Sequence, residues 1–261
     1  MKQFIVLIIL LSAGSISYAQ KADTIVVTAK TLNIKNLKPG KSHYLLYFSD
    51  LNEQNHKNLE FWTRTVSFKN WSGKEIIEIS QSWESRDSVY HTAMSVCDKK
   101  TFGTLYQETW WGMKERGTYK AEINFEDRKA IIQGKDLTSD TSSAMAKECL
   151  AAFDQARNEY NLNWHLDLET FALLPLAENK VFKINFYEAG YPTPPKWETY
   201  AVVGSNTFTG FNNVPVDCWL LKHVTDQSEE VFWVSKETHE VLKLKQKQGD
   251  QYRFKIKLEG I

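Results

Sequence analysis

The sequence predicts a mainly β protein, a β-rich α+β fold in which a strongly curved antiparallel sheet or open barrel packs on one amphipathic helix. Three observations lead to this prediction. Short segments rich in Val, Ile, Thr, Tyr, Phe and Trp recur between turn-forming residues, which is typical of strands. Their connections are short, so strands that are neighbours in sequence can pair antiparallel. One segment in the middle of the chain instead has apolar residues at helical spacing.

The first 19 residues have the pattern of a signal peptide. Lys2 precedes an apolar run over residues 4–11, and Ser17 and Ala19 stand at the −3 and −1 positions of a cleavage site. The run is much shorter than the roughly 20 residues that cross a bilayer, and no other segment could span one. We therefore expect cleavage near Ala19 and a periplasmic or secreted protein without a transmembrane segment.

The remaining chain is expected to form one domain. Residues 20–42, polar and rich in lysine, indicate an extended lead-in, and residues 43–261 are predicted to form a single β-rich domain with a helix near residues 142–160. Basic and acidic residues balance at 32 each. Because this balance gives no net attraction for phosphates, we expect no nucleic-acid partner.

Two groups of strands are predicted, one before and one after the helix. The first comprises His43–Phe48, Glu60–Lys69, Lys74–Ser82, Ser88–Cys97, Thr104–Lys114, Thr118–Phe125 and Lys129–Gln133. The second comprises Val181–Tyr187, Thr199–Val203, Asp217–Val224, Glu230–Val234, Glu240–Gln248 and Tyr252–Leu258. The sequence leaves open whether this sheet closes into a barrel.

The last two strands show the alternation best. Apolar residues at positions 252, 254, 256 and 258 alternate with Arg253, Lys255 and Lys257. This period predicts a buried apolar face and a solvated basic face. The turn at residues 248–251 indicates a hairpin with the preceding strand.

The helix is predicted from a stripe of side chains at helical spacing. It follows the cap candidates at residues 140–143. The stripe consists of Met145, Cys149, Phe153, Ala156 and Tyr160. Such a stripe needs a sheet to cover it, so we expect this helix to pack centrally against the curved sheet.

The stretch NWHLDLETFALLP, residues 163–175, permits two interpretations. His165, Asp167 and Glu169 are two residues apart, which could indicate a metal site. In the alternative, Leu168, Phe171 and Leu174 form a short helix that Pro175 ends, with Asp167 as its N-cap and Glu169 near its positive end. The helical interpretation explains more residues, so no metal site is predicted.

Adjacent aromatic pairs suggest where a ligand could bind. In Phe61-Trp62 and Trp110-Trp111, neighbouring side chains on a strand point to opposite faces. Either the sheet is covered on both sides there, or one ring is available to a ligand. We select Trp62, Trp111 and Tyr119 as candidate ligand-binding residues.

No motif of an enzyme or a cofactor site is present. The chain lacks a nucleophile elbow, a phosphate loop and a dinucleotide fingerprint, and His239-Glu240 lacks the second histidine of a zinc motif. We therefore expect no cofactor and name no catalytic residue. The three cysteines do not form a scaffold, although Cys97 and Cys218 both lie in predicted strands and could pair.

Part of the sequence resembles a known family. The segments LDLETFALLPLAENKVFKINFYEAG and VDCWLLKHV followed by VFWVSKETHEVLKLKQKQGDQYRFKIKL are similar to exported bacterial domains of unknown function, those of the family numbered 3108. The resemblance covers residues 40–258. It implies an envelope location in a Gram-negative bacterium of the Bacteroidetes type and a sheet curved around a helix, and it carries over no catalytic residue.

Three functional hypotheses follow. The leading one is a non-enzymatic envelope protein whose concave sheet and aromatic side chains bind a lipid-like, glycan or protein partner. The second is an envelope hydrolase in which Asp167, Glu169 or His91 transfers protons. The third is a structural component of an outer-membrane assembly.

Overall fold

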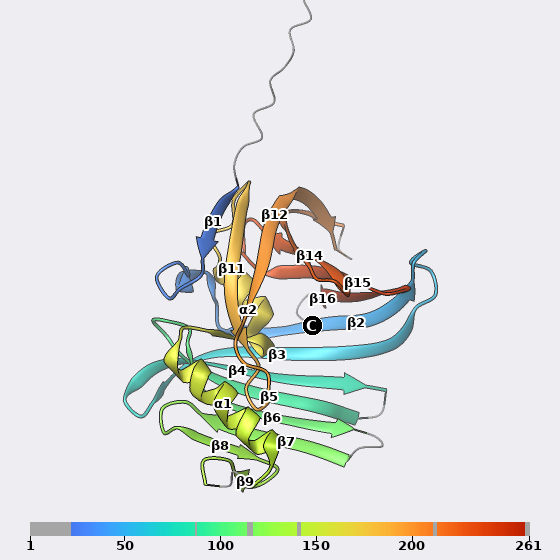
Figure 1. Ribbon diagram of the computed structural model, residues 1–261. Coiled ribbons are helices and arrows are strands. Elements are labelled where there is room, and N and C mark those ends of the chain that lie inside the picture. Colours follow the sequence, from blue (N-terminus) through green and yellow to red (C-terminus); the bar gives the residue numbers. More distant parts are fainter. Residues whose placement is uncertain (1–21, 87, 114–116, 140–141, 211–212, 259–261) are drawn as a thin grey trace, which may run out of the picture.

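The computed structural model describes residues 22–86, 88–113, 117–139, 142–210 and 213–258, and the predicted signal peptide lies outside them. In this part of the chain, 16 strands form one curved sheet whose path is open (Figure 1). The first part contains β1 (Asp23–Val26), η1 (Ile34–Asn36), β2 (Gly40–Asp50), β3 (Lys57–Trp71), β4 (Lys74–Ser85), β5 (Ser88–Asp98), β6 (Thr104–Met113), β7 (Gly117–Asn124), β8 (Lys129–Ile132) and β9 (Lys135–Asp136). The second contains α1 (Ala144–Asn158), β10 (Leu162–Asn163), η2 (Trp164–Leu166), α2 (Asp167–Leu173), β11 (Lys180–Tyr187), β12 (Lys196–Thr209), β13 (Pro215–Val224), β14 (Ser228–Ser235), β15 (Val241–Gln248) and β16 (Gln251–Leu258).

The two predicted groups of strands form one sheet because β16, near the C-terminus, pairs with β2, near the N-terminus. The sheet runs from β1 through β11–β16 and then β2–β9, with β16 antiparallel to β2 over eight residue pairs. Among the strands of the described residues, only β1 and β10 pair in parallel, both with β11. The mainly β class and the curved, unclosed sheet agree with the sequence prediction.

Two helices, and not one, pack on this sheet. Phe171 of α2 contacts Tyr200 of β12 and Phe232 of β14, with ring centroids 4.8 and 4.7 Å apart. The same core cluster contains Trp62 from the other half of the sheet, so α2 fills the concavity. The predicted long helix, α1, lies instead over β7 and β8, where Phe153 packs in a smaller cluster with Ile123 and Ala130 (Figure 1).

The limits of α1 are close to those predicted, but its buried stripe differs in part from the predicted one. Ser143 is the N-cap, and its hydroxyl accepts a hydrogen bond of 3.1 Å from the Ala146 N–H. The buried residues are Ala146, Cys149, Ala152, Phe153 and Ala156. Met145 was predicted among them and is 60% exposed, because it lies in the first turn and the buried stripe begins one residue later.

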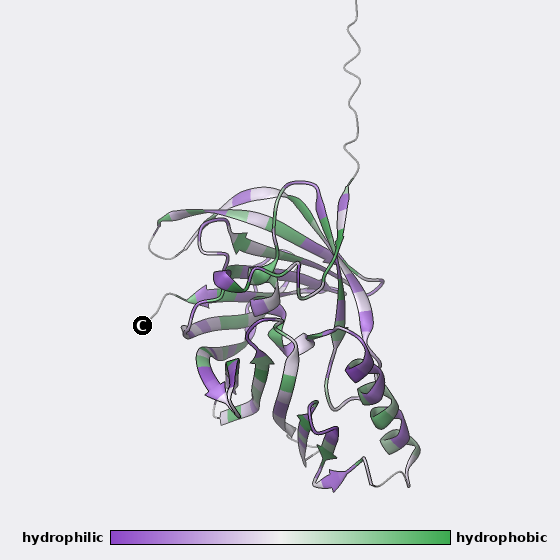
Figure 2. Cartoon of the chain, turned by 90° about the vertical axis from the view of Figure 1, so that its left-hand side faces the viewer, coloured by the Kyte–Doolittle hydropathy of each residue, from purple (hydrophilic) through white to green (hydrophobic). Residues whose placement is uncertain are grey.

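In the final strand, β16, the side chains that face the concavity are not the ones predicted. Lys255 is only 2% exposed, and its ammonium lies 4.3 Å from the centre of the Trp62 ring, within the concavity. Phe254 is equally buried but lies on the outer face, stacked on Tyr47 at 5.1 Å and covered by Lys245. Both faces are therefore covered here, and the basic face points inward. Figure 2 shows the alternation of polar and apolar residues along the strands.

All three cysteines are free and buried. Cys97 lies in β5 and Cys218 in β13, which are far apart in the strand order, so the pair considered above does not form. In the described part of the chain, no helix has the length and apolar character needed to cross a membrane.

Candidate functional site

A cleft opens where β2 begins and where β14 turns into β15. It consists of two adjoining pockets of about 660 Å³ each, which we call the polar chamber and the apolar chamber. Polar residues lining the first include Lys35, Asn36, Lys38, Lys41, Ser42, Tyr44, Glu169, Glu237, His239, Glu240 and Lys257. Apolar residues lining the second are Phe208, Val214, Val216, Leu242, Ile256 and Leu258. Since six residues line both chambers, they form one continuous mouth cleft.

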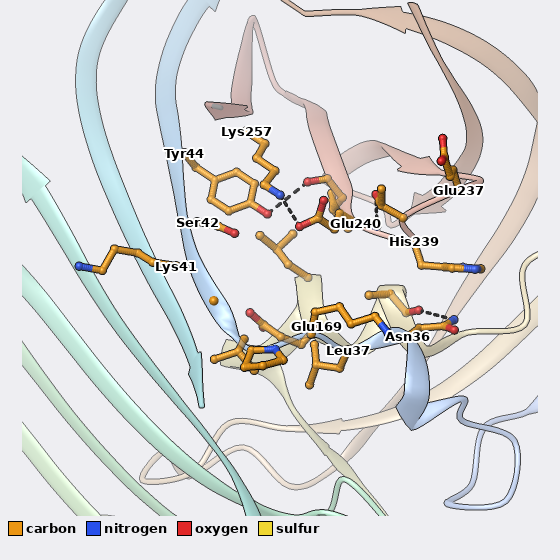
Figure 3. A pocket seen from close by; sticks show the side chains of 18 of the residues that line it. Asn36, Leu37, Lys41, Ser42, Tyr44, Glu169, Glu237, His239, Glu240 and Lys257 are labelled. Atoms are coloured by element: carbon orange, nitrogen blue, oxygen red, sulfur yellow. Dashed lines mark hydrogen bonds and ion pairs between the residues drawn. The ribbon is translucent and has the colours of Figure 1, made fainter. Parts of the chain in front are cut away.

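An ion pair stands at the boundary between the chambers. Lys257 on β16 binds Glu240, and both residues line both chambers (Figure 3). The turn before β15 positions Glu240: His239 has a left-handed φ of 62°, and its N–H donates to the Ser235 carbonyl at 3.0 Å. The boundary is therefore set by backbone geometry and by one charge pair.

The floor of the polar chamber rests on α2 and β2. The Tyr44 hydroxyl donates to the Val241 carbonyl at 3.2 Å, and burial raises its pKa. The Asn36 amide donates to the Ala172 carbonyl at 3.1 Å, which ties η1 to α2. Figure 3 shows Glu240 and Lys257 on one side of this chamber and Glu169 beside Leu37 on the other.

Beneath the chamber, Glu169 is held by a buried arginine. Arg64 is 3% exposed, and its guanidinium donates to both carboxylate oxygens of Glu169, with the Nε to Oε1 distance at 2.9 Å. It also donates to the His165 carbonyl at 2.9 Å and to the Gln81 side chain at 3.2 Å. This planar, two-point contact fixes α2 to β3 and β4.

A second buried cation lies beside the first. Asp167 is within 3.8 Å of the Arg64 guanidinium and 3.7 Å of the Lys255 ammonium. Burial lowers the pKa of Lys255 to about 8, although the nearby Asp167 opposes this. Arg64 and Lys255 thus share Asp167, and Arg64 also holds Glu169, so each of these buried cations has an acidic partner.

The structure corrects the prediction for the stretch of residues 163–175. The short helix is confirmed as α2, and Leu168, Phe171 and Leu174 are buried. Asp167, however, is the first helical residue and not the N-cap, and the cap position is Leu166. Its carboxylate accepts from the Leu168 N–H at 2.8 Å and faces the buried cations.

Two buried neutral histidines, His165 and His91, lie next to the buried ion pairs of Arg64 and Lys255. Asn163 donates to the Gln107 side-chain oxygen at 2.6 Å, so the Gln107 amide nitrogen points to His165 Nδ1 at 3.2 Å. Burial lowers the pKa of His165 to about 4, helped by the charge of Arg64. Burial also lowers the pKa of His91 to about 3, and its Nδ1 donates to the Trp110 carbonyl at 2.8 Å. His91 is therefore a buried neutral group in the physiological range.

The three candidate ligand-binding residues lie in one row across the sheet. Cross-strand pairing from β2 to β7 aligns Tyr44, Trp62, Trp83, His91, Trp111 and Tyr119. The ring centroids of Trp62 and Trp83 are 3.7 Å apart and nearly parallel, and those of His91 and Trp111 are 3.6 Å apart. Tyr44, Trp62 and His91 of this aromatic row are buried, and Trp83, Trp111 and Tyr119 are half-buried.

None of the three borders the mouth cleft. Of the residues that line it, the sequence singled out Glu169 as a candidate metal ligand or proton-transfer group, but it did not single out Arg64, which lies beneath the cleft. Arg64 could have been found, since it shares the inward phase of β3 with Trp62 and Val66. The lining of the apolar chamber had no such signal, because it combines residues from β12, β13, β15 and β16.

Comparisons with known proteins give a family and a distant structural neighbour. A family model described as a protein of unknown function (DUF3108) matches residues 43–258. A crystal structure described as a β-barrel-like protein of the domain of unknown function DUF1849 from Brucella abortus is similar at a TM-score of 0.46 and 10% identity, covering 83% of this chain and 95% of that chain. No curated protein matches the sequence.

Proposed function

The chain belongs to the DUF3108 family of proteins of unknown function, and on that premise we propose that it is a non-enzymatic binding protein of the bacterial envelope whose mouth cleft takes a lipid-like ligand. Its N-terminal pattern supports export and cleavage near Ala19, and thus a periplasmic or secreted location.

The observation that carries this proposal is the apolar chamber. Phe208, Val216, Leu242 and Ile256 line a pocket of about 660 Å³ that is open to solvent beside a charged chamber. Burying a methylene group contributes about 0.8 kcal/mol, so a chain of several carbons in this chamber gains enough to offset part of the cost of association. A polar end of the ligand would then lie near Lys257.

Binding is favoured over hydrolysis because of how the candidate catalytic groups are engaged. Both oxygens of Glu169 accept from Arg64, and His91 is 0% exposed. Asp167 forms ion pairs with two cations, Arg64 and Lys255. These contacts suit groups that hold α2 in place more than groups that exchange protons with a substrate.

The test is a calorimetric titration of the lipid-stripped protein with fatty acids of increasing chain length. Phe208→Glu should weaken binding at least about tenfold, since it places a charge in the apolar chamber. Val203→Glu is the matched control, because Val203 lies on the same strand, is 54% exposed and does not line the cleft. Affinity that does not depend on chain length, or equal effects of the two variants, would refute the proposal.

A further inference from the structure

A separate small pocket lies at the loop end of the β11–β12 hairpin. It has a volume of about 150 Å³, and its lining includes Trp164, Phe186, Glu188, Lys196 and Glu198. None of these residues borders the mouth cleft. The pocket is therefore independent of the proposed lipid site.

The two carboxylates in this pocket differ in their partners. Glu198 lies 2.6 Å from the Lys196 ammonium and 3.5 Å from His223 Nε2. Within the described residues, the Glu188 carboxylate has no hydrogen bond or ion pair, although burial raises its pKa. Glu188 is half-buried and has no counter-charge of its own, so a cation bound in this pocket would neutralise its carboxylate.

Two aromatic residues line the same pocket as this carboxylate. Trp164 is 38% exposed and meets Phe186 edge to face, with ring centroids 4.7 Å apart. Phe186 and Trp164 both line the pocket together with Glu188. The electron-rich faces of such rings attract cations.

The hairpin loop that carries Glu188 is fixed in place. The Tyr119 hydroxyl donates to the Gly190 carbonyl at 2.5 Å. Gly190 has a φ of 92°, and a Cβ atom there would lie 2.9 Å from the Ala121 side chain. Only glycine permits this approach without strain, so the loop is docked on β7 and the pocket is preformed.

We infer that this pocket binds an organic ammonium group, with Glu188 as the counter-charge and Trp164 as the aromatic wall. Either a primary amine or a quaternary ammonium has the required charge and a compact shape. A neutral sugar could stack on Trp164 but would leave the charge of Glu188 uncompensated.

The test compares choline with its uncharged carbon isostere, dimethylbutanol, by calorimetry on the folded protein. We expect measurable binding of choline and at least about tenfold weaker binding of the isostere. Methylammonium and glucose serve as further probes of charge and of sugar binding. Binding of choline should strengthen as the pH rises through the titration of Glu188.

Variants separate this site from a general charge effect. Glu188→Gln should weaken choline binding about tenfold or more, and Trp164→Leu should weaken it by a smaller factor. Glu178→Gln changes the net charge equally at an exposed position and should have no effect. Equal affinity for choline and the isostere, no binding of choline, preference for glucose, or equal effects of the two glutamine variants would each overturn the inference.

Discussion

Replacing Arg64 with methionine should strongly destabilise the fold. Arg64 makes its contacts with Glu169, Gln81 and the His165 carbonyl in a buried environment. Its removal leaves the Glu169 carboxylate without a counter-charge in the core, and breaking a buried pair in this way costs about 3–5 kcal/mol. Domains are stable by only about 5–15 kcal/mol, so much of the stability would be lost.

The assay is urea unfolding monitored by tryptophan fluorescence. With slopes of about 1–3 kcal/mol/M, a loss of this size should lower the midpoint by roughly 1–5 M. Lys74→Met is the control, because its ion pair with Glu126 is on the surface and should contribute little to stability.

A double variant tests whether the cost comes from the unpaired charge. Arg64→Met with Glu169→Leu removes both partners and should recover most of the lost free energy of unfolding, since an apolar pair can replace a buried ion pair. The reasoning is refuted if Arg64→Met loses no more stability than Lys74→Met. It is also refuted if the double variant loses the sum of the two single losses.

Four further predictions concern stability and reactivity. His91 and His165 stay neutral in the folded state, with pKa values of about 3 and about 4, whereas the unfolded chain takes up protons on them below about pH 6.5. Stability should therefore fall as the pH drops from 6.5 towards 4, by about 2 kcal/mol per histidine at pH 5. The half-buried carboxyl groups of Glu188 and Glu230, whose pKa values are raised, offset part of this loss. Thermal unfolding that is unchanged between pH 7 and 5 would contradict this. Ser143→Ala should cost about 1 kcal/mol in urea unfolding through loss of the α1 cap. Gly190→Ala should destabilise by about 1–3 kcal/mol and raise hydrogen exchange in the loop it anchors. The thiol of Cys97, with a pKa raised by burial, should react with a thiol reagent only after unfolding; rapid labelling of the folded protein would show that β5 opens.

The sequence by itself determined the local elements of this protein. Alternation at period two located the strands, as at residues 252–258, and three-residue steps with Pro175 located the helix of Leu168 and Phe171. The Ser143 region was also recognised as a helix start. These features could be predicted because they depend on neighbours within a few residues.

Only the tertiary structure decided which face of each strand is inside and which distant groups meet. Period two separates the two faces of β16 but does not rank them, and because both are covered, Lys255 points into the core while Phe254 packs outside. The partnership of Arg64 and Glu169 spans 105 positions, and the aromatic row and mouth cleft depend on the register of many strands in succession. The relative position of two distant strands depends on the register of every strand pair between them, and short-range patterns in the sequence do not determine those registers.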